Sequence, residues 1–198
     1  EDEKDLYYRC LKNLEIESHE RGIPILGSLK GKWLLRKIRE LKPEKILELG
    51  TANGYSGIIL GSEKGKLTTV EINPSLAKEA KKNFEEFKIK AEVIIGDGVE
   101  LVKKISLNKK GYFDLIFIDF AKKSYVKVLE DCIRLVKKNR FIIADNMSFE
   151  ECSGFKEAVL NHPELETEII EVGDWMSFSR KIAPVRFKNK LMVTKNYH

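Results

Sequence analysis

The sequence contains no glutamine, and only three histidines and three cysteines occur among its 198 residues. The cysteines, Cys10, Cys132 and Cys152, lie far apart and form no C-x-x-C pair, which argues against a disulfide framework or a zinc knuckle. The histidines are equally scattered, so a histidine-based metal centre is not expected. A chain without paired thiols favours a reducing, cytoplasmic setting.

Long apolar runs are also missing. No stretch approaches the roughly 18 apolar residues that a membrane-spanning helix requires. The acidic first segment, EDEKDLYYRC, lacks the apolar region of a secretory signal. The net charge of +5 is small, so it permits an anionic partner without requiring one. The composition therefore predicts a globular chain of roughly one domain that makes no membrane contact.

Short apolar runs alternate along the chain with amphipathic stretches. The amphipathic stretches carry apolar residues at helical spacing, as Leu26–Leu41 does before the first run. Near-continuous apolar runs are typical of strands that are covered on both faces. Strand and helix in alternation predict an α/β fold with a doubly wound, mostly parallel sheet. The five runs are Lys45–Leu49, Leu67–Ile72, Ala91–Ile95, Phe113–Ile118 and Arg140–Ala144.

The last third of the chain has a different pattern. Glu166–Val172 and Trp175–Arg180 resemble two strands, and Gly173 and Asp174 join them. A Gly-Asp pair between two strands predicts a hairpin. The hairpin would bring the sheet to seven strands and close its edge with antiparallel pairs.

These patterns also predict the organisation of the chain. We expect a single domain over residues 1–181, in which helices of residues 1–42 cover the site. The segment 182–198 is basic and weakly patterned. It is expected to form a basic tail or an extra edge strand.

The first predicted strand runs into a glycine-containing loop, Glu48–Ser56. Gly50 and Gly54 would let the backbone approach a ligand closely, and such sheets bind ligands at the carboxyl ends of their strands. The spacing differs from the G-x-G-x-x-G of dinucleotide sites. Glu48 would repel a phosphate, but it would suit a ligand that carries an ammonium and a sulfonium.

Acidic residues also follow the second and third predicted strands. Glu71 lies where this fold class places a ribose-binding carboxylate, which would accept charge-assisted hydrogen bonds from two hydroxyls. Asp97 lies in a sharp turn between two glycines. Acids at three successive strand ends predict one nucleoside pocket. In the alternative interpretation, Gly50 and Gly54 form an ordinary turn and Glu71 is a solvated strand end.

Oxygen-bearing side chains follow the fourth and fifth predicted strands. Asp119 ends one strand, and Asp145 and Asn146 end the other. Oxygen donors without histidine or cysteine suit Mg²⁺ or Ca²⁺, and the nearby Lys122 would serve as a base. In the alternative interpretation, Asp119 caps a helix, Asp145 and Asn146 form an Asx turn, and Lys122 is a surface charge.

These motifs together resemble the class I S-adenosylmethionine-dependent methyltransferases. Within that class they are most similar to the cation-dependent O-methyltransferases, which include catechol and caffeoyl-CoA O-methyltransferases. The similarity covers roughly Gly22 to Lys181. The motif ELGTANGYS at Glu48–Ser56 indicates only a cofactor binder, whereas D-x-x-K-x-x-Y from Asp119 and D-N at Asp145 are more specific.

The resemblance implies a role for each matching residue. S-adenosyl-L-methionine would be bound by Glu48, Gly50, Gly54, Tyr55, Ser56, Glu71, Asp97 and Asp119. The methionine part would lie along Glu48 and Gly50, with its carboxylate near Tyr55 and Ser56. Mg²⁺ or another divalent cation would be held by Asp119, Asp145 and Asn146. Lys122 would be the catalytic base that takes the proton of the substrate.

Three functions follow from this interpretation. The first is metal-dependent O-methylation of a catechol-like small molecule by a homodimer, the assembly that the resemblance implies. The second is methylation of a hydroxylated pyrimidine base in tRNA, which the basic residues near the end of the chain allow. The third is a non-enzymatic domain that binds the cofactor. Retention of Asp119, Lys122, Asp145 and Asn146 argues against the third.

Overall fold

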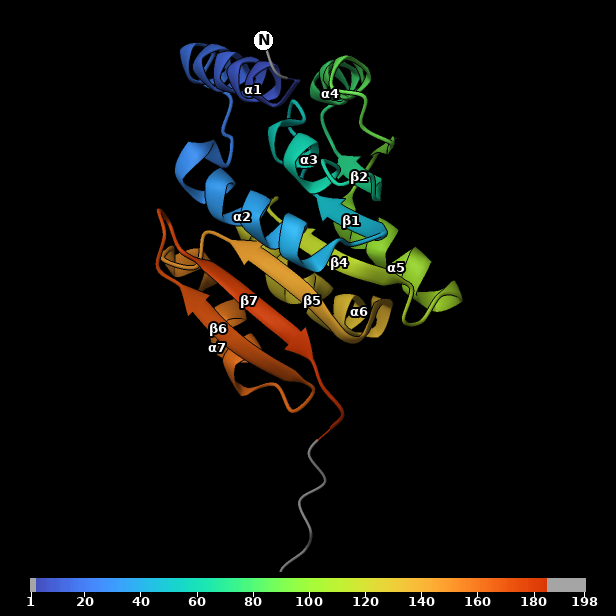
Figure 1. Cartoon of the computed structure of the whole chain (residues 1–198). Helices are drawn as coiled ribbons and strands as arrows, with labels where there is room; N and C mark the ends of the chain where they lie inside the picture. The colour runs from blue at the N-terminus through green and yellow to red at the C-terminus, as the bar shows by residue number, and fades with distance from the viewer. Residues whose placement is uncertain (1–2, 185–198) are drawn as a thin grey trace, which may run out of the picture.

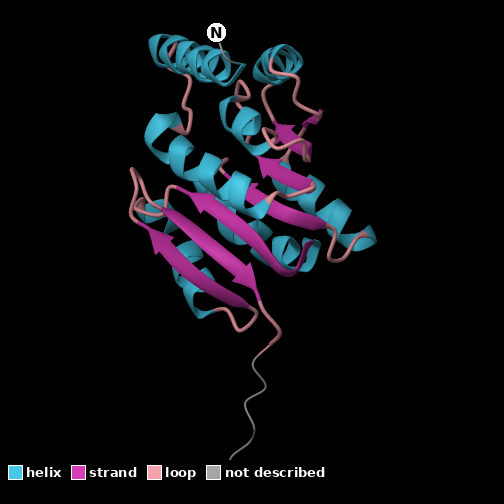
Figure 2. Cartoon of the chain, viewed as in Figure 1, coloured by secondary structure: helices cyan, strands magenta, loops and turns pink. Residues whose placement is uncertain are grey.

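The structure of the chain is a computed structural model that describes residues 3–184 (Figure 1). A seven-stranded sheet with the order β3-β2-β1-β4-β5-β7-β6 forms its centre. The pairs β5–β7 and β7–β6 are antiparallel, and the other pairs are parallel. Figure 2 shows helices on both faces of this sheet. The predicted doubly wound sheet with a carboxyl-terminal hairpin is therefore confirmed.

The strands agree closely with the apolar runs of the sequence. Strand β5 begins at Val136 rather than at Arg140, and its pairing with β4 shifts register between Phe113 and Leu115. That irregularity adds polar residues to the start of the strand, which the apolar pattern does not show. The strands are β1 (Lys45–Leu49), β2 (Lys66–Glu71), β3 (Ala91–Ile95), β4 (Phe113–Ile118), β5 (Val136–Asp145), β6 (Leu165–Ile170) and β7 (Met176–Lys181).

Seven α-helices and two short 3₁₀ helices accompany these strands within the described chain, and α1 and α2 precede the first strand. Helix α4 begins at Pro74 because the Asn73 side chain caps it and accepts hydrogen bonds from the amides of Ser75 and Leu76. None of the helices in residues 3–184 combines the length and the apolar character needed to cross a bilayer. The helices are α1 (Glu3–Glu20), α2 (Gly27–Leu41), α3 (Tyr55–Leu60), α4 (Pro74–Glu86), α5 (Gly98–Asn108), η1 (Lys122–Ser124), α6 (Tyr125–Leu135), η2 (Glu150–Cys152) and α7 (Ser153–Asn161).

Two apolar cores lie on opposite faces of the sheet, because successive strand residues point to opposite faces. Leu47 and Leu49 pack into the core that α6 shares. Ile46 packs with Leu34 and Ile38 of α2 in the other core. Figure 1 shows α2 across one face and α5 and α6 on the other. Full burial of each such side chain contributes about 1.5–3 kcal/mol, so the sheet is a rigid support for the loops at its carboxyl ends.

The connection between β6 and β7 is longer than the sequence predicts. Strand β7 begins at Met176, and the prediction that it includes Trp175 is wrong. Trp175 has a left-handed backbone conformation, φ 63°, and its amide donates to the carbonyl of Val172 at 2.9 Å. A residue in this conformation ends a turn and cannot continue a strand. The predicted tail over 182–198 falls outside the described residues from residue 185 onward.

Candidate active site

A cavity of about 520 Å³ opens at the carboxyl ends of the parallel strands. Its volume is in the range of small-molecule binding sites. It lies where the strand order reverses direction, since β1 is flanked by β2 on one side and β4 on the other. Nine of the predicted site residues line it, and Glu48 and Gly54 do not. The nine are Gly50, Tyr55, Ser56, Glu71, Asp97, Asp119, Lys122, Asp145 and Asn146.

Gly50 brings the end of β1 against the end of β4. It has φ 99°, and a Cβ built on it would lie 1.9 Å from the carbonyl oxygen of Asp119. The Asp119 amide in turn donates to the carbonyl of Leu49 at 2.9 Å. Glycine is needed here for its backbone conformation and for the close approach of two chain segments.

Replacing Gly50 by Ala is expected to destabilise the protein by more than about 2 kcal/mol, because a strained left-handed residue and a backbone clash add together. Urea unfolding of the purified variant measures this change. Gly96→Ala is the matched control, since a Cβ at Gly96 meets nothing within 4 Å. Equal stability of the two variants would contradict this account of Gly50.

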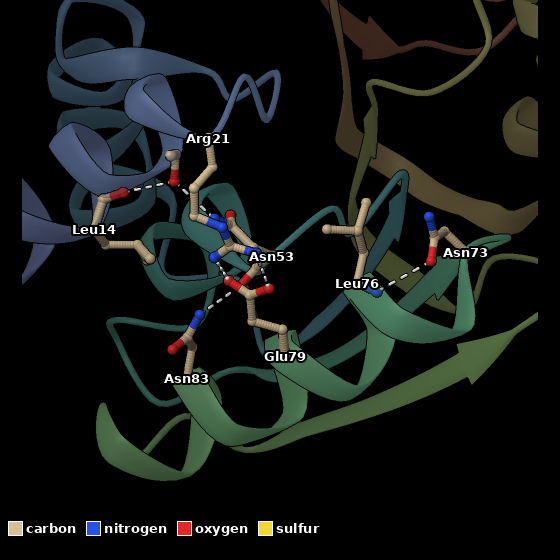
Figure 3. Close-up of polar contacts among 8 residues, drawn as sticks. Leu14, Arg21, Asn53, Asn73, Leu76, Glu79 and Asn83 are labelled. Atoms are coloured by element: carbon tan, nitrogen blue, oxygen red, sulfur yellow. Dashed lines mark hydrogen bonds and ion pairs between the residues drawn. The ribbon is translucent and has the colours of Figure 1, made fainter.

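The glycine loop is also held from outside by α1 and α4 (Figure 3). Asn53 donates through Nδ2 to Ser18 Oγ at 2.7 Å, and Asn83 Nδ2 donates to the Asn53 carbonyl at 2.8 Å. Arg21 at the end of α1 forms a two-pronged ion pair with Glu79 of α4, with N–O distances of 2.6 and 2.9 Å. These contacts fix the loop between two helices, and no sequence motif indicated them.

Glu48 lies beneath the loop and not on the cavity wall. Its carboxylate accepts hydrogen bonds from Ser56 Oγ at 2.6 Å and from Thr69 Oγ1 at 2.7 Å. Thr69 also shares a hydrogen bond with Thr51 in the loop, at 2.6 Å. Complete burial raises the pKa of Glu48 to about 8. The carboxyl group therefore connects β1, β2 and the start of α3.

Glu71 and Asp97 reach the cavity from the ends of β2 and β3. The two oxygens of Glu71 accept hydrogen bonds from the amides of Ala52 and Asn73, at 2.9 and 3.0 Å. Asp97 caps α5 through the amides of Val99 and Glu100. Each carboxylate oxygen can accept more than one hydrogen bond. Both acids are thus fixed in place and remain able to bind hydroxyl or amino groups of a ligand.

Asp119, Asp145 and Asn146 come together at the ends of β4 and β5, which pair through Ile118 and Ala144. Asn146 donates through Nδ2 to Asp119 Oδ1 at 3.0 Å and to the hydroxyl of Tyr125 at 3.1 Å. Burial, together with the charge of Asp145, raises the pKa of Asp119 to about 7, and burial also raises the pKa of Asp145. A cation between these side chains would relieve this repulsion.

Lys30 of α2 is a member of this cluster that sequence reasoning missed. Its ammonium lies 2.9 Å from Oδ1 and 2.8 Å from Oδ2 of Asp145, and 3.6 Å from Oδ2 of Asp174. The two partners of the first ion pair are 115 positions apart in the chain, so no local pattern indicates the contact.

The donor set at this end of the cavity fits a hard divalent cation. It offers the carboxylates of Asp119 and Asp145. The two hydrogen bonds of Asn146 use its Nδ2 atom, so its Oδ1 atom can be a third oxygen ligand. Lys30 already places a positive charge on Asp145, as a cation at this position would. In the described part of the chain, no group of three or more His, Cys, Asp or Glu side chains is arranged to hold a metal. The fit therefore requires the amide oxygen.

Lys122 begins the short helix η1, three residues after Asp119, and lines the cavity. Its ammonium lies 4.6 Å from the ring centroid of Phe149, another lining residue. Contact with an aromatic face holds a lysine while its nitrogen stays accessible. A basic group thus stands next to the carboxylate cluster, as the sequence predicts.

A sequence profile described as O-methyltransferase matches residues 9–182 of the chain. The chain belongs to this O-methyltransferase family. The predicted resemblance to the class I S-adenosylmethionine-dependent O-methyltransferases is thereby confirmed.

Curated relatives of this O-methyltransferase family member include the catechol O-methyltransferase of Niastella koreensis. It is 32% identical over 135 residues, which cover 65% of this chain and 61% of the relative. The catechol O-methyltransferase of Mycobacterium tuberculosis is 29% identical, over 62% of this chain and 56% of the relative. The chain thus matches about three fifths of the length of these two relatives.

Solved O-methyltransferase structures share the fold of the chain. The enzyme from Bacillus cereus in complex with SAH has a TM-score of 0.76 at 22% identity, over 86% of this chain and 90% of that one. TomG from Streptomyces achromogenes, in complex with SAM, has a TM-score of 0.78 at 20% identity, over 92% and 91%. These similarities show that the fold is shared.

Proposed function

We propose that the protein transfers a methyl group from S-adenosyl-L-methionine to a hydroxyl of a catechol-like small molecule, with the help of a divalent cation. The observation that carries this proposal is the meeting of Asp119, Asp145, Asn146 and Lys122 in the same cavity as Glu71. The curated relatives named catechol O-methyltransferase support the substrate class. A cytoplasmic homodimer is part of the same proposal, and light scattering tests the assembly.

The cofactor would extend along the ends of β1, β2 and β3. Glu71 would accept hydrogen bonds from the ribose hydroxyls, and Asp97 would lie near the adenine. Gly96 gives a ligand room, since no atom lies within 4 Å of where its Cβ would be. Gly50, Tyr55 and Ser56 line the cavity on the methionine side. The SAM and SAH complexes of the two solved structures support this cofactor.

Asp119, Asp145 and Asn146 would hold the divalent cation. When bound, such a cation stabilises a substrate oxyanion and lowers the pKa of the hydroxyl. Lys122, as a neutral amine, would take the hydroxyl proton on its Nζ. The cofactor would supply the methyl group, whose bond to sulfur breaks as its bond to the substrate oxygen forms, and S-adenosylhomocysteine would leave. The step neutralises charge, so a cavity with apolar walls such as Leu26 and Phe120 favours it. Positioning of the two reactants supplies much of the remaining acceleration.

Replacing Glu71 by Ala is expected to weaken S-adenosylmethionine binding by about 1–3 kcal/mol, because charge-assisted hydrogen bonds to the ribose are lost. Isothermal titration calorimetry measures the dissociation constant. Glu92→Ala, an exposed acid on the neighbouring strand β3, is the control and should leave binding unchanged. An unchanged constant for the Glu71 variant would remove this residue from the pocket.

A radiolabelled methyl-transfer screen tests the proposed function. Catechols, phenols carried on acyl-CoA and bulk tRNA are offered as acceptors, each with and without a chelator. If the proposal is right, catechol becomes labelled, and the chelator abolishes this labelling. Labelling of tRNA alone would favour a hydroxylated pyrimidine base as the acceptor. No transfer to any acceptor would favour a binding domain without activity.

A further inference from the structure

Lys30 connects α2 to the carboxylate cluster through a buried ion pair. The lysine is 6% exposed and Asp145 is 2% exposed. The lysine ammonium is within 3 Å of both Asp145 oxygens, at 2.9 and 2.8 Å. The Lys30 ammonium thus forms hydrogen bonds with both oxygens of Asp145, the residue that we propose as a ligand of the divalent cation.

The aliphatic part of the Lys30 side chain is also closely packed. Gly173, in the turn before β7, has φ 55°, and a Cβ there would lie 3.2 to 3.4 Å from Cγ, Cδ and Cε of Lys30. The turn therefore leaves room for this side chain. Lys32, two positions further along α2, is exposed. Packing and charge together distinguish Lys30 from an ordinary surface lysine.

A second acidic partner lies close to Lys30. Asp174 places Oδ2 at 3.6 Å from the ammonium, and its side chain is 55% exposed. The ammonium therefore has another carboxylate within reach if it leaves Asp145. Two cations on one buried carboxylate repel each other strongly, because little solvent screens them.

We propose that Lys30 is a positioning residue that serves as an internal counter-ion for the cation site. Its ammonium neutralises Asp145 until a divalent cation takes over that carboxylate, and it then moves toward Asp174. Cation binding is thus an exchange of one positive charge for another, and Lys30 lowers the affinity of the site. This inference rests on the proposed function, since it needs a cation that binds Asp145.

Titration of the metal alone tests the exchange. Mn²⁺ binding is measured by calorimetry and by the electron paramagnetic resonance signal of free Mn²⁺, without cofactor or acceptor. We expect Lys30→Met to bind Mn²⁺ at least tenfold more tightly than the unmodified protein. Lys32→Met, the matched control, should agree with the unmodified protein within twofold. Lys30→Gln keeps a hydrogen-bond donor for Asp145 without the charge, and it should also bind Mn²⁺ more tightly.

A purely structural role for Lys30 predicts a different result. It would lower the melting temperature of the variants and leave their Mn²⁺ affinity within twofold of the unmodified protein, which would overturn the proposal. Weaker Mn²⁺ binding by Lys30→Gln would overturn it as well, because Lys30 would then organise the site instead of competing with the cation. If the unmodified protein binds no Mn²⁺, the cation itself is wrong and the proposed function fails with it.

Discussion

Asp145→Asn is expected to reduce cation-stimulated methyl transfer by on the order of 100- to 1000-fold, the loss that follows removal of one electrostatic stabiliser from a transition state. Asn keeps the shape of the side chain and removes its charge. Asp145 lies at the end of β5, and β1 and β4 separate it from β2, which carries Glu71. Three strand spacings amount to about 14 Å. The affinity for S-adenosylmethionine should therefore change by no more than a few fold.

Turnover at saturating Mg²⁺ and the dissociation constant of the cofactor measure these two effects separately. Glu151→Gln is the control, since Glu151 is an exposed acid of the nearby helix η2 and does not line the cavity. A parallel loss of turnover and cofactor affinity would show that Asp145 supports the cavity as a whole, and would contradict its assignment to the cation.

Lys122→Met is expected to lower turnover by about 100- to 10,000-fold, the contribution of a well-placed general base. Met keeps an unbranched side chain of nearly the same length, and it removes the nitrogen that accepts the proton and lies over the Phe149 ring. Cofactor affinity and cation affinity should stay within a few fold, because other residues provide them. Single-turnover methyl transfer measured by mass spectrometry isolates this step.

Lys123→Met is the matched control for the proposed base. It removes the neighbouring ammonium of the same helix, η1, which is exposed and does not line the cavity. Its turnover should match that of the unmodified protein. If turnover of the Lys122 variant falls by less than about threefold, another group or solvent takes the proton.

The sequence predicts most of the fold because strands buried on both faces need near-continuous apolar runs. The bounds of β1, β3 and β4 follow directly from such runs. The turn before β7 does not, because a left-handed backbone at a non-glycine residue such as Trp175 has no marker in the sequence. Gly173 and Asp174 indicate a turn but not its length.

The candidate site is predictable only where its residues follow strand ends. Asp119, Asp145 and Asn146 meet because β4 and β5 are neighbours in the sheet. Lys30 comes from a helix whose path across the sheet no local pattern describes. Glu48 shows a further limit. It precedes Gly50 by two positions and still belongs to β1, so its side chain lies under the loop instead of in the cavity.

The backbone contact between Gly50 and Asp119 has a consequence for how such a protein can diversify. The two ends of the cavity that we propose for the nucleoside and for the cation share this contact, so a substitution at one end is expected to disturb the other. Phe149 and Asp174 line the same cavity from connecting segments outside the strands. New acceptor preferences should therefore arise by substitution at positions such as Phe149 and Asp174, while the contact between Gly50 and Asp119 stays unchanged.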